Sequence, residues 1–200
     1  MKSFLKICIV LFGSFITSIG ITLFITTGHG VDPISVLLQG LENVTPFRFG
    51  TLSQLFNAII LFVVFMLDRS KIYWGSLINA LSVGFFINLL IELPIFTFSG
   101  FEAYFLSFIG VILLGMGLAI YLSAEFGVGA LEGLMIYLSE RWSISIKYIR
   151  IGLDATLVIS GFLLGGTVGL GTIAGVLLIG PTVEWTLKFI NVFVKRTILC

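Results

Sequence analysis

The sequence has 200 residues, of which 58% are hydrophobic and only 10% carry a charged side chain, and its mean hydropathy is +1.17. This composition is typical of an integral membrane protein and leaves no room for a sizeable soluble domain. A net charge of +1 provides no basic surface, so nucleic-acid binding is excluded. Because His29, Cys8 and Cys200 are the sole histidine and cysteines, we expect no metal site, no cofactor and no enzymatic activity.

Six apolar segments are long enough to cross a bilayer as α-helices. In chain order they are residues 5–27, 51–67, 75–93, 104–124, 151–166 and 172–190. Two further apolar segments, 33–43 and 130–140, span only about 17 Å as helices, too short for a hydrocarbon core of about 30 Å. We interpret them as re-entrant or interfacial half-helices, and Pro33 suits the first turn of such a helix. An eight-span arrangement, in which both segments cross, is the alternative.

The second half of the chain repeats the first. A shift of 97 residues aligns Gly13 with Gly110, Gly20 with Gly117 and Gly30 with Gly127, and after a deletion of one residue Gly75 aligns with Gly171 and Gly84 with Gly180. We therefore predict two halves, 1–96 and 97–200, each with three spans and one half-helix. An odd number of spans inserts the second half upside down, which makes an inverted 3+3 repeat of the kind found in many secondary transporters.

The basic residues predict the orientation. With six spans and a cytoplasmic N-terminus, every Lys and Arg except Arg48 faces the cytoplasm, as the positive-inside rule requires. The eight-span alternative would place Arg69 and Lys71 outside. We expect an all-α, multi-pass protein of the bacterial cytoplasmic membrane with both termini in the cytoplasm.

Several motifs resemble those of a known family. They are Gly30-Val31-Asp32-Pro33-Ile34, Gly127-Val128-Gly129 followed by Glu132-Gly133-Leu134-Met135, Arg150 four residues before Asp154, and the run Gly165-Gly166-x2-Gly169-Leu170-Gly171-Thr172. Over nearly the whole chain the sequence resembles the YczE/YyaS/YitT family of bacterial membrane proteins. That family usually carries Pro and Asp where this sequence has Ala130 and Glu132, and commonly Glu at Asp154, so acidity is retained. The resemblance implies a polytopic fold and, for function, transport or support of secreted-metabolite production.

Three carboxylates fall within apolar segments of the second half. A charge inside lipid costs about 2.5–3.5 kcal/mol, so Glu132, Asp154 and Glu184 require partners or water. Arg150 precedes Asp154 by four residues and Glu184 precedes Lys188 by four, which places each pair on one helix face. The pairs are either interfacial ion pairs or, with Glu132, the wall of a water-filled pocket that binds a solute or a proton.

These residues define a predicted solute pathway and a set of predicted hinges. The pathway consists of Asp32, Asn57, Asn88, Glu132, Arg150, Asp154 and Glu184. The hinge positions are Pro33, Gly127, Gly129, Gly165, Gly166, Gly169, Gly171 and Pro181. As alternatives, the amides hydrogen-bond neighbouring helices and the glycines serve helix packing. Pro181 is expected to kink or break the last span.

We expect a transporter that moves a small polar solute by alternating access. Its partners would be the lipid bilayer and the solute, with a second copy of the chain or a membrane partner protein as further candidates. The alternatives are a non-transporting scaffold or assembly factor and a substrate-capturing subunit of a larger transport complex.

Overall fold

The computed structural model describes residues 2–93 and 101–198, and within these ranges the chain is entirely helical. The α-helices are α1 (Lys2–Thr27), α2 (Pro33–Val44), α3 (Phe49–Leu67), α4 (Trp74–Ile91), α5 (Phe101–Ser123), α6 (Ala130–Trp142), α7 (Ile146–Leu163) and α8 (Leu170–Ile198). A single 3-10 turn, Arg69–Lys71, joins α3 to α4. The expectation of an all-α protein is confirmed, since helices satisfy their own backbone groups in lipid.

Five of these helices are long and apolar enough to cross a membrane, namely α1, α3, α4, α5 and α8. The chain is therefore a multi-pass helical membrane protein. α7 overlaps the predicted span 151–166 but begins five residues earlier and ends at Leu163. It is not among the five, because it contains three charged residues, Lys147, Arg150 and Asp154. The count of six spans thus stays a prediction. α2 and α6 have 12 and 13 residues, about 18–20 Å of helix.

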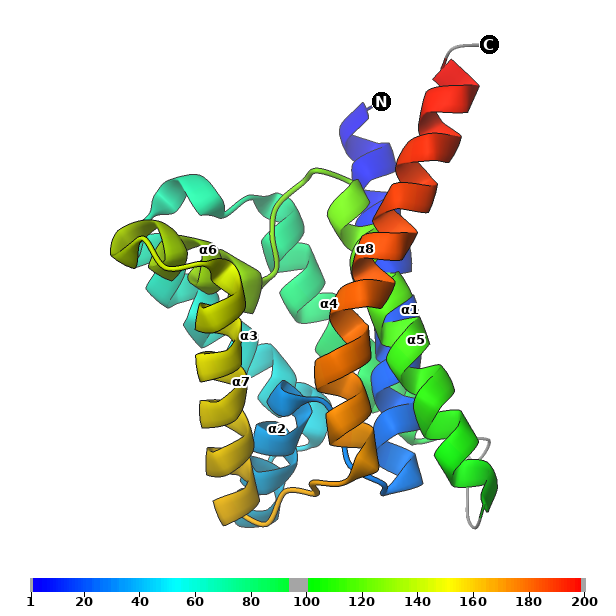
Figure 1. The fold of residues 1–200 in the computed structure, drawn as a ribbon, viewed down its shortest axis with the longest axis vertical. Helices are drawn as coiled ribbons and strands as arrows, with labels where there is room; N and C mark the ends of the chain where they lie inside the picture. The colour runs from blue at the N-terminus through cyan, green and yellow to red at the C-terminus, as the bar shows by residue number, and fades with distance from the viewer. Residues whose placement is uncertain (1, 94–100, 199–200) are drawn as a thin grey trace.

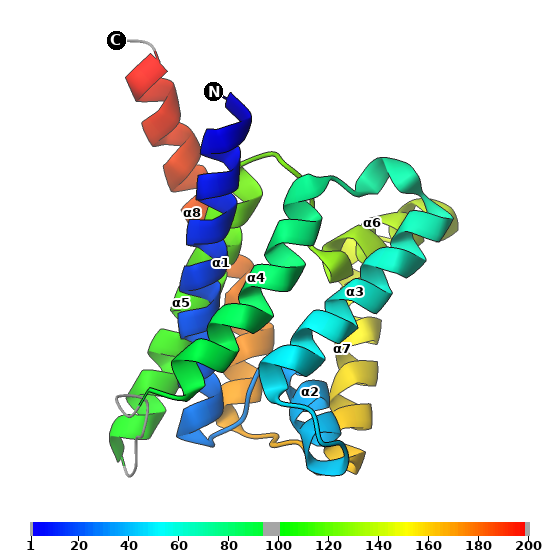
Figure 2. The ribbon, with the colours of Figure 1, turned by 180° about the vertical axis from the view of Figure 1, so that it is seen from behind.

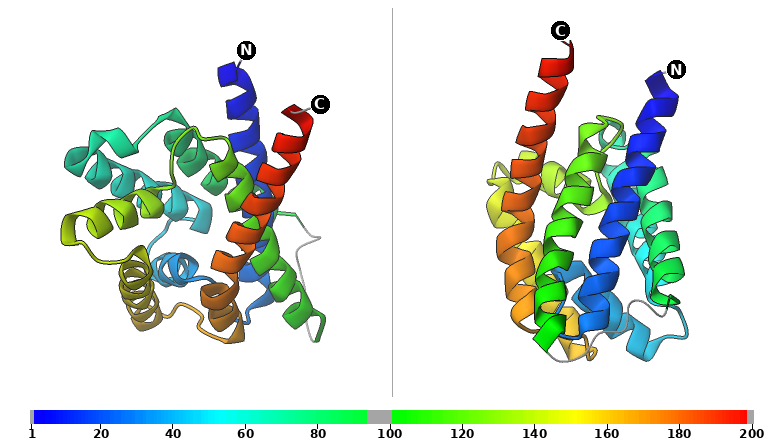
Figure 3. Two further views of the ribbon diagram at one scale, coloured as in Figure 1. Left: turned by 45° about the horizontal axis from the view of Figure 1, so that its top comes forward. Right: turned by 90° about the vertical axis from the view of Figure 1, so that its right-hand side faces the viewer.

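Four long helices form one layer of the molecule. Figure 3 (right) shows α8, α5, α1 and α4 side by side in that order, and the closest packing in the molecule is between α1 and α5. α1 and α5 run in opposite directions, and the two ends of the chain lie at the same end of the molecule (Figure 1). The remaining helices form a second layer, in which α2 packs on α7 and α6 packs on α3.

Glycines bring α1 and α5 into backbone contact. A Cβ atom on Gly13 would lie 2.6 Å from the backbone nitrogen of Tyr121, and one on Gly20 would lie 2.5 Å from that of Leu114. Real Cβ atoms do not approach so closely, so only glycine fits at these positions. Small residues allow such close approach in lipid, where dispersion forces rather than the hydrophobic effect hold helices together.

The short helices α2 and α6 lie toward opposite ends of the molecule (Figures 1 and 2). The loop before each is hydrogen-bonded to the start of a long helix. The Gly171 N–H donates to the carbonyl of His29 over 2.9 Å, and the Gly75 N–H donates to the carbonyl of Phe126 over 2.9 Å. These bonds fix the loops from which α2 and α6 begin.

Of the two outcomes expected at Pro181, a kink or a break, the break does not occur. α8 continues from Leu170 to Ile198 with Pro181 inside it. Proline removes one backbone hydrogen bond, but local adjustment and neighbouring helices can compensate for that loss within a membrane.

Candidate functional site

A cavity of about 120 Å³ lies where the N-terminal ends of α2 and α6 face each other between the two layers. At about 30 Å³ per molecule in the liquid, this volume holds roughly four waters. The cavity has apolar walls with polar groups at a few points. The polar residues of its lining include Asp32, Ser35, Ser53, Asn57, Asn79 and Glu132.

Asp32 enters the cavity from the start of α2. It is the N-cap of that helix, and Pro33 occupies the first turn as expected. Its carboxylate accepts a hydrogen bond from the Ser35 hydroxyl at 2.5 Å and one from the Ser35 backbone N–H at 3.3 Å. The side chain is buried, and Gly175 of α8 lies against it. Asp32 therefore stands where α2, α8 and the cavity meet.

Glu132 enters from the first turn of α6. Its carboxylate folds back over Gly129, the N-cap residue, where any side chain larger than hydrogen would collide with it. Glu132 is half-buried and lies close enough to Arg150 and Asp154 to sense both charges. Arg150 and Asp154 themselves form an ion pair, with Nε and Oδ2 3.5 Å apart. Neither residue of this pair lines the cavity, so the predicted pocket shared by Glu132, Arg150 and Asp154 stays a prediction.

Neutral polar groups line the rest of the cavity. The Asn57 amide donates to the Ser53 carbonyl at 2.8 Å, and the Asn79 side-chain oxygen accepts from the Ser14 hydroxyl at 2.7 Å. These bonds leave Asn57 Oδ1 and Asn79 Nδ2 available to a bound molecule. Ser53 is only 4% exposed, and within residues 2–93 and 101–198 its hydroxyl has no hydrogen-bond partner.

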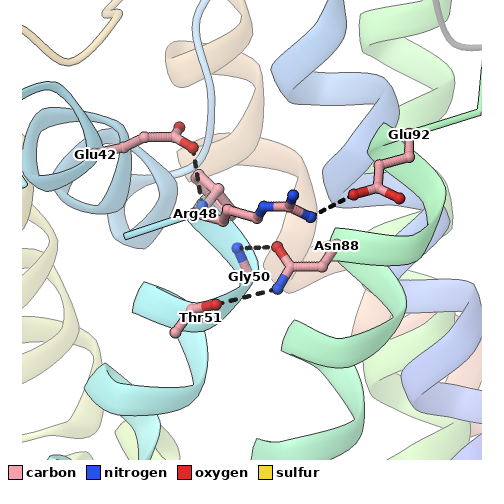
Figure 4. A network of polar contacts seen from close by, with 7 residues as sticks. Glu42, Arg48, Gly50, Thr51, Asn88 and Glu92 are labelled. Carbon is pink, nitrogen blue, oxygen red and sulfur yellow. Dashed lines mark hydrogen bonds and ion pairs between the residues drawn. The ribbon is translucent and has the colours of Figure 1, made fainter. Parts of the chain in front are cut away.

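Four residues of the predicted pathway do not line the cavity, namely Arg150 and Asp154 of the ion pair on α7, Glu184 and Asn88. Glu184 is on α8, where its carboxylate pairs with Lys188 at 2.6 Å and both side chains are 69% exposed. Asn88 belongs to the contact between α3 and α4: its Oδ1 accepts from the Gly50 N–H at 3.0 Å, and its Nδ2 donates to the Thr51 hydroxyl at 3.2 Å (Figure 4).

Two glycines and an ion pair hold α3 against α4. A Cβ atom on Gly50 or on Gly84 would collide with the carbonyl oxygen of the other residue. Beside this crossing, Arg48 forms an ion pair with Glu92, so the start of α3 is joined to the end of α4 (Figure 4). Sequence reasoning did not find this contact, although paired small residues were its signal.

In the predicted repeat, α7 and α8 correspond to α3 and α4, but α7 and α8 do not pack against each other. The two helices make almost no backbone contact, although both lie wholly within the described part of the chain. A Cβ atom on Gly152 of α7 or on Gly180 of α8 would have no neighbour within 4 Å. The side of the molecule between α7 and α8 is therefore open, whereas the side between α3 and α4 is closed.

The glycine-rich run between α7 and α8 packs against the first half of the chain. Gly166 lies against the Val36 carbonyl, and Gly169 lies against the His29 carbonyl. Gly165 has a φ of +89° and its carbonyl accepts from the Asn43 amide at 2.9 Å. Gly171 is held by His29, as described above. These glycines contact α2 and the loop before it, so packing accounts for them.

The second group of predicted hinge residues precedes α6. Gly127 has a φ of +132°, which side chains rarely allow, and a Cβ atom there would also lie 2.5 Å from the Ser76 hydroxyl oxygen. Gly129 is extended and begins the helix. Both residues therefore shape the turn that brings Glu132 to the cavity.

Comparison with known proteins places the chain among proteins without an assigned activity. It is 33% identical over 184 residues to an uncharacterised protein of Haemophilus influenzae, covering 92% of this chain and 84% of that one. It is 28% identical over 178 residues to the uncharacterised membrane protein YczE of Bacillus subtilis (88% and 82% covered) and 29% identical over 171 residues to the uncharacterised protein YyaS of the same organism (84% and 85%).

No solved structure matches the chain. The resemblance to YczE and YyaS inferred from the motifs is confirmed. Residues 4–188 match the family of unknown function DUF6198, and the chain belongs to that family.

Proposed function

We propose that this chain is an inverted 3+3 repeat that carries a small polar solute across the bacterial cytoplasmic membrane by alternating access, with both termini in the cytoplasm. One observation carries the proposal. Contacts between helices recur at equivalent positions of the two halves, with one exception. α3 packs against α4, whereas the equivalent helices of the second half, α7 and α8, are apart. Two equivalent interfaces in opposite states are what an alternating-access protein needs.

The hydrogen bonds of the loops support the repeat. Gly171 follows Gly75 by 96 residues and Phe126 follows His29 by 97, which is the shift found in the sequence. The Gly75–Phe126 bond and the Gly171–His29 bond are therefore equivalent, and both measure 2.9 Å. Each joins the first half of the chain to the second. Such reciprocity is expected of two halves related by a two-fold axis.

The packing of the short helices supports it as well. A Cβ atom on Gly161 of α7 would collide with the backbone of Val36 of α2. The residues at the equivalent positions are Val64 of α3 and Gly133 of α6. They are also in contact, since a Cβ atom on Gly133 would lie 3.5 Å from a methyl carbon of Val64. In Figure 1, α3 and α7 run in opposite directions, as do α4 and α8. The contact of α7 with α2 and the contact of α3 with α6 thus both join the two halves at equivalent positions.

The α3–α4 contact, which has no counterpart between α7 and α8, involves one pair of positions in each half. The repeat makes the Gly50–Gly84 crossing equivalent to Lys147 and Gly180. Gly84 is packed against Gly50, whereas Gly180 faces open space. In the proposed cycle the two pairs exchange states, so that α7 closes on α8 when α3 separates from α4. Because the open side lies toward the chain ends, this conformation would open to the cytoplasm.

Cysteine cross-linking tests the exchange. In a background with Cys8 and Cys200 replaced by serine, the pair Thr51→Cys and Asn88→Cys should form a disulfide directly, since the two side chains are in hydrogen-bond contact at 3.2 Å. This pair is the control for the closed state.

The equivalent pair is Tyr148→Cys with Glu184→Cys, both at exposed positions. We expect it to cross-link in membranes as a second, mutually exclusive population, and the closed α3–α4 disulfide should abolish it. A 148–184 pair that never cross-links while the 51–88 pair does so fully would refute alternating access and favour a static scaffold. Solute that shifts the ratio of the two disulfides would identify a transported compound.

A further inference from the structure

We propose that the cavity between α2 and α6 binds a small monovalent cation with N–H donors, such as ammonium or a short protonated amine. The proposal rests on the proposed function only for the movement of that cation across the membrane, because binding itself requires only the cavity. Asp32 and Glu132 supply the charge, and Ser53 and Asn57 supply neutral acceptors.

The charge balance of the cavity favours a cation. Within residues 2–93 and 101–198, no Lys or Arg nitrogen lies within 4 Å of the Asp32 or Glu132 carboxylate. The N-terminus of each short helix carries the equivalent of about +0.5 charge, so two helix ends offset roughly half of the two carboxylate charges. With both carboxylates ionised, about one negative charge remains at the cavity, and one monovalent cation would neutralise it.

The neighbouring charges leave this balance unchanged. Arg150 pairs with Asp154 rather than with either cavity carboxylate. This ion pair is neutral as a whole, and neither of its residues lines the cavity. An anionic solute in the cavity would therefore face Asp32 and Glu132 together, whereas a cation would relieve their mutual repulsion.

Two uncharged groups of the cavity can accept from N–H donors, although the Asn79 amide nitrogen can only donate. Ser53 is only 4% exposed and lines the cavity, and its hydroxyl has no hydrogen-bond partner within the described residues. A bound N–H donor would give this hydroxyl a partner, and a typical hydrogen bond contributes about 0.5–1.5 kcal/mol. Asn57 Oδ1 offers a second acceptor, since the amide nitrogen is already used. A molecule with several N–H groups can thus meet acceptors on both sides.

The volume limits the size of the cation. A cavity of about 120 Å³ has room for the equivalent of roughly four waters. Ammonium, methylammonium and ethylammonium fall within this size, and tetraethylammonium does not. This difference provides a size control with the same charge.

Binding is measured on the purified full-length protein in detergent, by the shift of its thermal unfolding midpoint with methylammonium chloride. Sodium chloride at equal ionic strength, tetraethylammonium chloride and sodium formate are the comparison salts. A ligand that binds only the folded state raises the midpoint as its concentration passes the dissociation constant. We expect a saturable rise with methylammonium and none with the other three salts.

The variants Asp32→Asn and Glu132→Gln remove one charge each and retain side-chain size. Each should weaken methylammonium binding at least tenfold, whereas Glu102→Gln, at an exposed carboxylate at the start of α5, should leave it unchanged. Asp32 also caps α2, so Glu132→Gln decides the question if Asp32→Asn fails to fold.

A midpoint raised by formate but not by methylammonium would overturn the proposal, because the helix N-termini would then dominate the cavity. Methylammonium binding that both charge variants leave intact would overturn it as well. Uptake of labelled methylammonium into liposomes is the separate test of transport. Saturable binding without uptake would support the cation site and refute the proposed transport function.

Discussion

The sharpest test of the asymmetry between the two halves is a pair of matched substitutions, Gly84→Ala and Gly180→Ala. Both glycines lie inside long helices at equivalent positions of the repeat, so alanine gains about 0.5–1 kcal/mol of helix propensity at either one. At residue 180, however, its Cβ atom also crowds the ring of Pro181, the next residue. Only at Gly84 does the new Cβ atom collide with a backbone atom, the Gly50 carbonyl oxygen. Overpacking of this kind costs about 1–3 kcal/mol, because neither backbone can move aside.

The propensity gain is shared by the two variants, so their difference is the packing cost of about 2 kcal/mol at Gly84 less the cost of the crowding between the new methyl group at residue 180 and Pro181. For a chain of this size, each kcal/mol shifts the unfolding midpoint by about 2–4 °C, and we expect Gly84→Ala to melt several degrees, at most about 4–8 °C, below Gly180→Ala. The assay is thermal unfolding of the purified protein in one detergent. Equal midpoints, or a larger loss at Gly180, would mean that α7 and α8 pack together and would refute the argument for an open side.

Three further predictions concern other parts of the fold. On α7, Gly161→Ala should lower the unfolding midpoint by several degrees, because its Cβ atom would meet the backbone of α2, whereas Gly152→Ala faces open space and should not lower it. Replacing the helix cap with Asp32→Ala should cost about 1 kcal/mol in denaturant unfolding, and Asp32→Asn should recover most of that loss. In the cysteine-free background, an impermeant thiol reagent applied to intact cells should label a cysteine at Thr45 and spare one at Ser70, and the opposite pattern would mean that α2 crosses the membrane.

Sequence patterns predict the positions of the helices in this protein closely. The apolar segments 33–43 and 130–140 correspond to helices Pro33–Val44 and Ala130–Trp142, and the first turn of α2 contains the expected proline. Length and hydropathy suffice here because a bilayer imposes one thickness on every spanning element. The ion pairs of Arg150 with Asp154 and of Glu184 with Lys188 were likewise predictable, since a spacing of four residues places both partners on one helix face.

The parts that could not be predicted depend on which helices meet. Glu184 and Glu132 are both carboxylates in apolar segments, yet only Glu132 reaches the cavity, because α6 begins beside it, whereas the Glu184 side chain on α8 is 69% exposed and pairs with Lys188. Asn88 was expected on the pathway and instead joins α3 to α4. The glycines from Gly165 to Gly171 read as a hinge in sequence, but their role is set by α2, which is distant in the chain.

The charges on α7 have a consequence for how the protein is made. Lys147, Arg150 and Asp154 each oppose partition of this 18-residue helix from the translocon into lipid. In the finished protein α7 packs mainly on α2, a helix synthesised about a hundred residues earlier. Insertion of α7 therefore depends on a docking surface that the first half must already have built. Fragment 97–200 synthesised alone would lack α2, and we expect α7 to remain at the membrane surface in that fragment.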